Sequence, residues 1–263
     1  MRIGCCIPGG SFMPQDNEKE MDALTRLTIG AQMILDNGFD FAEGTVGMIM
    51  ALSEEQLQEA AGKVRLAACN SFIPGRGTVI EGGDSLRQYV FEAMRRLNVL
   101  QCPLVVFGSG AARTIPEDMP WEEGMRRVRE FLEICQEAGE KYGVEVALEP
   151  LNKKETNMMN TVSDAIEMCK EYGLSRITVL ADAYHMAQEK EDLAHMKDAG
   201  ALLRHVHVSE ADRSCPGSTD DLRVFAAALK EAGYDGDVSA ECIYTDFSVE
   251  CGKAAWYMKE VFK

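Results

Sequence analysis

The sequence predicts an α/β fold, a single (β/α)8 TIM barrel in which eight parallel strands are each followed by a helix. Short apolar runs alternate with longer amphipathic stretches from end to end, which is typical of a parallel sheet. The 263 residues are close to the ~250 that such a barrel needs. No linker, low-complexity tract or charge block divides the chain, so we expect one domain over residues 1–263.

The apolar runs give the expected strands in order, at residues 2–7, 39–43, 66–72, 104–108, 144–149, 177–182, 205–209 and 238–242. Between them, apolar residues recur at helical spacing, with start and stop signals such as Ser53 and Gly38. The expected helices cover residues 21–37, 54–63, 84–97, 121–142, 161–172, 191–199, 220–232 and 249–261. Counting strands alone leaves an open doubly wound sheet as the alternative.

Charge and cysteine content narrow the class of protein. The chain has 43 acidic and 27 basic residues and a formal charge of −16, which disfavours nucleic acid and anionic membranes as partners. The nine cysteines show no CxxC spacing, so we expect free thiols in a reducing compartment. Neither a signal peptide nor a run of 18 apolar residues is visible, and we expect a cytoplasmic protein.

Polar residues stand at the carboxyl ends of four consecutive apolar strands. Glu149 follows VEVAL, Asp182 follows ITVLA, His205 and His207 share one side of HVHVS, and Glu241 follows VSA. Chemistry in a (β/α)8 barrel takes place at this end of the strands. Three neighbouring carboxylates repel one another, and a divalent cation is the simplest way to hold them together with an imidazole.

The alternative explanation is that each acid caps the following helix and each histidine is a hydrogen-bonded core residue. Four such residues on four consecutive strands favour a shared site instead. Ligands that are mostly oxygen, with one nitrogen, suit manganese, magnesium or cobalt better than a thiol-rich zinc site does. The sequence therefore predicts a metal centre at the mouth of the barrel.

Four segments then resemble a known family in their order, spacing and position at strand ends: LEPLNKKE (148–155), ADAYHM (181–186), HVHVSEADR (205–213) and SAECIY (239–244). They are similar to those of the xylose-isomerase-like TIM-barrel superfamily. Within it, the chain resembles the D-tagatose/D-psicose (ketose) 3-epimerases and related sugar isomerases and epimerases. The organisation agrees over the whole length, and the specific motifs lie between residues 144 and 244.

The resemblance implies that Glu149, Asp182, His207 and Glu241 bind one divalent metal ion, with Mn²⁺ expected first and Mg²⁺, Co²⁺ or Zn²⁺ as alternatives. It further implies that Glu149 and Glu241 are the catalytic acid/base pair. They would move a proton off one face of a ketose and onto the other, through an enediolate that the cation stabilises.

The resemblance also implies that Glu155, His185 and Arg213 contact the hydroxyl groups of a small sugar substrate. Glu43, which ends the second expected strand, is a further candidate for hydroxyl binding, and a capping residue otherwise. Members of this family commonly form dimers or tetramers, so we expect a homodimer or homotetramer.

Two loops depart from the family pattern. Residues 5–12 (CCIPGGSF) lack the expected run of aromatic residues, and residues 108–116 (GSGAARTIP) lack the expected tryptophan. Because these loops shape the substrate pocket, the identity of the sugar stays open. Arg113 and Arg76 follow strands and are candidates for binding a phosphate or carboxylate, although arginines in such loops are usually only exposed surface residues.

Other functions remain as alternatives. On the same scaffold, the substrate could be a keto-inositol, hydroxypyruvate or a 3-keto-C-glycoside, the last cleaved by a lyase. A non-catalytic sugar-binding or regulatory barrel would not need both glutamates. An abasic-site endonuclease is disfavoured because it needs several more histidines than the four present, which are His185, His195, His205 and His207.

Overall fold

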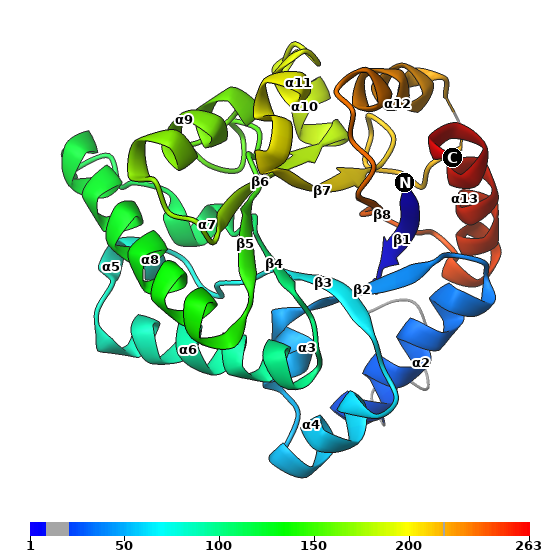
Figure 1. Ribbon diagram of the computed structural model, residues 1–263, viewed down its shortest axis with the longest axis horizontal. Helices are drawn as coiled ribbons and strands as arrows, with labels where there is room; N and C mark the ends of the chain where they lie inside the picture. The colour runs from blue at the N-terminus through cyan, green and yellow to red at the C-terminus, as the bar shows by residue number, and fades with distance from the viewer. Residues whose placement is uncertain (9–20, 218) are drawn as a thin grey trace.

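The computed structural model describes residues 1–8, 21–217 and 219–263, so the second half of the segment 5–12, whose expected aromatic residues are missing, lies outside the described residues. Within them, eight parallel strands pair in sequence order and close into a barrel (Figure 1). Because β1 pairs with both β2 and β8, the sheet has no open edge. The predicted barrel is confirmed, and the open sheet is excluded. The strands are β1 (Arg2–Cys6), β2 (Phe41–Thr45), β3 (Leu66–Asn70), β4 (Leu104–Phe107), β5 (Glu145–Leu148), β6 (Ile177–Asp182), β7 (Leu203–Val208) and β8 (Asp237–Ala240).

Helices surround the barrel, and the last of them packs beside the first strand (Figure 1). Among the described helices, none combines the length and apolar character that crossing a bilayer requires. The longer or outer helices are α2 (Ala23–Asp36), α4 (Glu54–Ala61), α6 (Asp84–Val99), α8 (Trp121–Tyr142), α9 (Val162–Tyr172), α11 (His195–Ala199), α12 (Asp221–Glu231) and α13 (Phe247–Phe262). Shorter ones are α3 (Val46–Met50), α5 (Thr78–Glu81), α7 (Gly110–Arg113), α10 (Ala183–Glu189) and the 3₁₀ turn Gly200–Leu202.

Local signals explain several helix ends. Ser53 and Gln56 form a reciprocal capping box at the start of α4. Gly143 ends α8 in the left-handed conformation, with a φ of 72°. The helix expected at 191–199 is wrong in extent, since α11 covers only His195–Ala199. The segment between β6 and β7 also contains α10, which begins directly after β6, where the Asp182 side chain accepts a hydrogen bond from the His185 amide.

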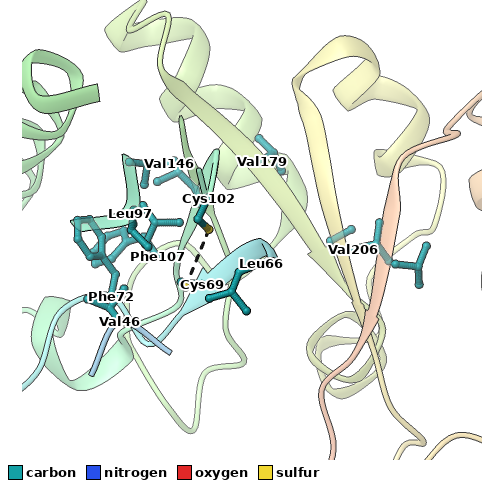
Figure 2. Packing of buried hydrophobic residues seen from close by; sticks show 14 of the residues in the cluster. Val46, Leu66, Cys69, Phe72, Leu97, Cys102, Phe107, Val146, Val179 and Val206 are labelled. Carbon is teal, nitrogen blue, oxygen red and sulfur yellow. Dashed lines mark hydrogen bonds between the residues drawn. The ribbon is translucent and has the colours of Figure 1, made fainter. Parts of the chain in front are cut away.

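Side chains alternate between the inside of the barrel and the layer under the helices. Val146, Val179 and Val206 belong to the large cluster between strands and helices (Figure 2). A separate cluster fills the barrel interior and consists of Ala68, Leu104, Val106, Ala147 and Leu180. Since the alternation has a period of two, the residues two positions beyond Ala147 and Leu180 also face inward, at the barrel mouth.

Aromatic packing fixes the strands that carry one wall of the mouth. The Phe131 ring of α8 lies 4.7 Å from the Phe107 ring and 6.1 Å from the Phe72 ring, measured between centroids. Figure 2 shows Phe72 and Phe107 packed together with Leu97 of α6. Because Phe107 ends β4 and Phe72 follows β3, this packing holds the loops after both strands.

Candidate active site

Four predicted ligands meet at the carboxyl ends of β5 to β8. Asp182 and His207 are register partners on the neighbouring strands β6 and β7. Glu149 and Glu241 directly follow β5 and β8, and their amides still bond to the adjacent strands, at 3.2 Å to Phe107 O and 3.0 Å to Val208 O. The mouth is therefore a continuation of the barrel ladder rather than a set of free loops.

The donor atoms of these residues lie close enough to share one ion. Glu149, Asp182, His207 and Glu241 each offer one ligand atom, and these atoms lie within 4.8 Å of one another. His207 Nδ1 is 3.3 Å from Glu149 Oε1 and 3.5 Å from Glu241 Oε2. Three carboxylates and one imidazole, nearly all buried, form a donor set that fits a hard or borderline divalent cation.

The two glutamates experience opposite electrostatic environments. Burial raises the pKa of the Glu149 carboxyl, and the nearby Glu241 charge adds to that rise. Burial acts in the same direction on Glu241, but His207 and Arg213 outweigh it and lower the pKa of Glu241 to about 2. Neighbouring carboxyls with separated pKa values are typical of an acid/base pair, since one can hold a proton while the other stays ionised.

Arg213 balances part of this negative charge. It donates from Nη1 to Asp182 Oδ2 at 2.9 Å and from Nη2 to Glu241 Oε2 at 2.7 Å. Its guanidinium also lies over the Tyr184 ring, 4.6 Å from the ring centroid. Burial opposes the charge on Arg213, but the neighbouring carboxylates raise its pKa above the usual value. The arginine therefore remains a cation at the edge of the site.

A cavity of 520 Å³ opens beside these groups, a size suited to a small organic ligand. It is lined by the expected substrate-binding residues Glu155, His185 and Arg213 together with Glu149 and Glu241. The opposite wall consists largely of small or polar residues at or just beyond the ends of β2, β3 and β4, among them Thr45, Asn70, Ser71, Gly75, Gly108 and Ser109.

His185 has a donor that the described residues leave without a partner. Its Nδ1 accepts a hydrogen bond from the Asn152 amide at 3.1 Å, so the proton of the neutral ring is on Nε2. That Nε2 is buried and makes no hydrogen bond within the described part of the chain. Glu155 lies near the other nitrogen of the ring, with Oε1 3.9 Å from His185 Nδ1. A ligand oxygen in the cavity would satisfy the unpaired donor.

Glu43 does not lie where the sequence places it. Strand β2 continues to Thr45, so Glu43 faces inward one layer below the mouth, is fully buried and is not among the residues that line the cavity. Its Oε2 is 2.8 Å from His205 Nε2, and its Oε1 is 3.0 Å from His207 Nε2. Burial alone would raise the pKa of Glu43, but the two imidazoles hold it well below its usual range. Glu43 therefore lies outside the described wall of the cavity, and binding of a substrate hydroxyl by Glu43 stays an untested prediction.

The two arginines considered for anion binding have other places. Arg113 is fully buried and donates to the carbonyl oxygens of Phe107 at 2.9 Å and Glu149 at 2.7 Å. Burial lowers its pKa to about 10. Arg76 is exposed and does not line the cavity. Arg113 therefore holds the backbone of a candidate ligand, and neither arginine is placed to bind an anion in the cavity.

Sequence reasoning missed two further residues at the site. Asn70 ends β3 and donates from Nδ2 to Glu241 Oε1 at 3.0 Å. It is a polar residue at the end of an apolar strand, so the signal that identified Glu149 could have found it. Gly108 approaches so closely that a Cβ atom there would lie 1.7 Å from Glu149 Oε2. No signal in the sequence marks position 108 as one that needs glycine, and only this contact in the structure reveals it.

Known proteins share this sequence pattern in part. A D-psicose 3-epimerase from Ruminiclostridium cellulolyticum is 30% identical over 131 residues, which are 49% of this chain and 43% of that protein. A 3-dehydro-D-guloside 4-epimerase from Escherichia coli is 33% identical over 130 residues, or 49% of each chain. The matched regions thus span less than half the length of these curated relatives.

Solved structures share the whole fold. A 3-keto-D-glucoside 4-epimerase from E. coli superposes with a TM-score of 0.80 at 22% identity, covering 99% of both chains. A D-allulose 3-epimerase from Methylomonas sp. gives a TM-score of 0.83 at 18% identity, covering 99% of this chain and 97% of that one. A zinc-bound IOLI protein gives 0.70 at 18% identity, covering 99% and 96%. Residues 32–260 match the family described as xylose isomerase-like TIM barrel. The chain belongs to that family.

Proposed function

We propose that this protein is a metal-dependent sugar epimerase that inverts one carbon of a ketose, with carbon 3 as the expected position. The convergence of Glu149, Asp182, His207 and Glu241 on one point carries the proposal. Epimerase names among the sequence relatives support it. Mn²⁺ is the expected ion, with Mg²⁺, Co²⁺ or Zn²⁺ as alternatives, because the donors are oxygen and imidazole nitrogen.

The proton transfers are assigned to the two glutamates. A bound cation would polarise the substrate carbonyl and so make the adjacent C–H more acidic. Glu149 and Glu241 reach the mouth from β5 and β8, which are separated by β6 and β7, so they flank a substrate from different sides. One carboxylate removes the proton, and the other returns a proton to the opposite face. His185 Nε2, Arg213 and Glu155 are assigned to the substrate hydroxyl groups.

The test replaces each glutamate with its amide. We expect Glu149→Gln and Glu241→Gln each to lower kcat about 100- to 10,000-fold on a panel of ketoses, because an amide cannot take up the proton. Glu145→Gln is the matched control, since Glu145 also belongs to β5 but pairs with Arg204 at 2.7 Å, away from the cavity. Metal content is measured in parallel. Wild-type turnover by either metal-loaded variant would show that the acid/base assignment is wrong.

One observation favours a second candidate, epimerisation at carbon 4 of a 3-keto-glycoside. The cavity wall formed by Thr45, Ser71, Gly75 and Ser109 is small and polar, and no aromatic ring is among the described residues that line it. Such a wall can accept the extra polar substituent of a glycoside. A relative with 33% identity is named for a 4-epimerase of this substrate type. Comparing kcat/KM for free ketoses and for 3-keto-glycosides decides between the two candidates.

A further inference from the structure

A buried carboxylate that the proposed reaction does not use lies directly beneath the site. Glu43 projects inward from β2 with no exposed surface, and it does not line the cavity. Its two oxygens face two different imidazoles, with Oε2 2.8 Å from His205 Nε2 and Oε1 3.0 Å from His207 Nε2. An isolated buried carboxylate would be costly, so these contacts must compensate for its lost hydration.

The geometry determines which nitrogen of each ring carries the proton. An ionised carboxylate accepts hydrogen bonds and donates none, so both imidazoles must present Nε2–H to Glu43. In His207 this leaves the lone pair of a neutral ring on Nδ1. That atom lies on the other side of the ring, 3.3 Å from Glu149 Oε1 and 3.5 Å from Glu241 Oε2. When His207 is neutral, as a metal ligand must be, its unprotonated nitrogen is therefore the one that faces the candidate ligands.

We propose that Glu43 and His205 form a positioning pair, which fixes the ring orientation and tautomer of His207 so that Nδ1 is available to a divalent cation. The inference rests on the metal centre of the proposed function. His205 bonds the second oxygen of Glu43 and so prevents the carboxylate from rotating away from His207. The two rings lie on β7 two residues apart, with centroids 5.1 Å apart and planes at 81°, which matches one carboxylate bridging both.

The roles of the members differ. His207 is the ligand, Glu43 orients it, and His205 orients Glu43. Partners of this kind in metal proteins typically account for a 10- to 100-fold change in metal affinity. A purely structural role for Glu43 would instead lower stability and leave the metal affinity of the folded protein unchanged.

The first experiment measures Mn²⁺ affinity by calorimetric titration of the metal-free, full-length protein. We expect Glu43→Gln to bind Mn²⁺ about 10- to 100-fold more weakly, because an amide can accept from one imidazole only. Glu43→Asp keeps the charge but is too short to bridge both rings, so it should also bind more weakly. Glu191→Gln is the matched control, since Glu191 pairs with His195 at 2.8 Å, is buried and lies outside the cavity. Its affinity should stay within twofold of wild type.

A second pair of variants keeps Glu43 intact in case its replacement prevents folding. His205→Gln retains a donor near the position of Nε2 and should keep nearly wild-type affinity, whereas His205→Leu removes the donor and should weaken binding. Imidazole ¹⁵N–¹H spectra of the Zn²⁺-loaded protein supply a readout independent of turnover. With only four histidines in the chain, the Nε2–H tautomer of His207 can be identified directly.

The possible outcomes separate the inference from the function on which it rests. If the wild type binds no divalent ion, the metal centre and the positioning pair are both wrong. If the wild type binds Mn²⁺ and Glu43→Gln, Glu43→Asp and His205→Leu bind it equally well, only the positioning pair is wrong. A His207 ring protonated on Nδ1 in the loaded wild type would also overturn it.

Discussion

Single atoms decide the geometry of the candidate ligands. Gly108 follows β4, and Glu149 follows β5, the neighbouring strand. The backbone of Gly108 approaches the Glu149 carboxylate so closely that no side chain fits between them. Arg113 also donates a hydrogen bond to the backbone carbonyl oxygen of Glu149. Two contacts that involve none of the other candidate ligands therefore help to position Glu149.

Replacing Gly108 with alanine tests this contact. A Cβ atom would lie 1.7 Å from Glu149 Oε2, so the carboxylate must move, and we expect Gly108→Ala to lower kcat/KM at least about 100-fold. Gly47→Ala is the control, because Gly47 lines the same cavity and its nearest neighbour to an added Cβ is 3.8 Å away. Steady-state kinetics with circular dichroism checks both variants. Full activity in Gly108→Ala would mean that Glu149 can shift without loss of function.

The pattern of polar residues at strand ends predicted which residues meet at the mouth, but not their depth. Glu149, Asp182, His207 and Glu241 converge as the alternation of β5 to β8 requires. The pattern did not predict the depth of Glu43, because β2 ends at Thr45, two residues beyond the end expected from its apolar residues. Two residues along a strand are one full layer of a barrel interior, and this difference separates a residue in the cavity wall from one beneath it.

At the scale of elements, long and periodic segments were predictable and short ones were not. Strand β6 and helix α8 match their predicted residues, since both have strong apolar periodicity. The short helices α3, α5, α7 and α10 were missed. They have four to seven residues, which is too few to show a helical period.

An ion network docks α6 against the turn that ends α3. Glu92 Oε1 accepts from Arg96 Nε at 2.6 Å, and Arg96 Nη1 in turn donates to the carbonyl oxygens of Ile49 at 3.2 Å and Leu52 at 2.8 Å. Glu92 also accepts from Arg95 Nε at 2.8 Å. Hydrogen bonds from Arg95 and then Arg96 lower the pKa of Glu92 to about 2, although burial opposes the shift. Glu92 thus orients Arg96, the arginine that connects α6 to the turn after α3.

The pH dependence of this network follows from the sign of the shift. The folded-state pKa of Glu92 lies below its unfolded value, so its stabilisation is complete above about pH 4.5 and is lost as the pH falls toward 2. We expect Glu92→Gln to lower the free energy of unfolding by less than ~1 kcal/mol at pH 7, because the pair is partly exposed. The difference from wild type should shrink between pH 5 and pH 3 in urea titrations.

The control for this prediction is an exposed pair of the same kind. Glu59 and Lys63 lie four residues apart on the surface, with more than half of each side chain exposed. Glu59→Gln should change stability very little at either pH. A difference between Glu92→Gln and wild type that stays constant from pH 7 to pH 3 would contradict the assigned role of Glu92.

At the scale of the whole molecule, metal binding should couple to folding. The candidate ligands come from β5, β6, β7 and β8, so an ion held by all four ties half of the barrel together. An ion that binds only the folded state stabilises it by about 2.7 kcal/mol at 100 times its Kd. For a chain of this size, we expect Tm to rise by roughly 5–10 °C when Mn²⁺ is added to chelator-treated protein.

Asp182→Asn is the variant that completes this experiment. It removes one carboxylate that is fully buried among the ligands and keeps nearly the same side-chain volume. We expect the variant to fold and its Tm to respond little to Mn²⁺ in differential scanning calorimetry. An equal rise of Tm in the variant and the wild type would place the ion elsewhere in the molecule.

The rim of the barrel is divided between two halves of the chain. All candidate ligands come from β5 to β8, whereas the opposing wall of the cavity comes from β2, β3 and β4 and consists largely of glycine, serine and threonine. Within the described part of the chain, Thr45 and Ser71 form no hydrogen bond to a candidate ligand, so we expect that mutation can change them without moving the candidate ligands. Substrate preference can therefore diverge among descendants of this protein while the glutamates proposed for proton transfer are inherited unchanged.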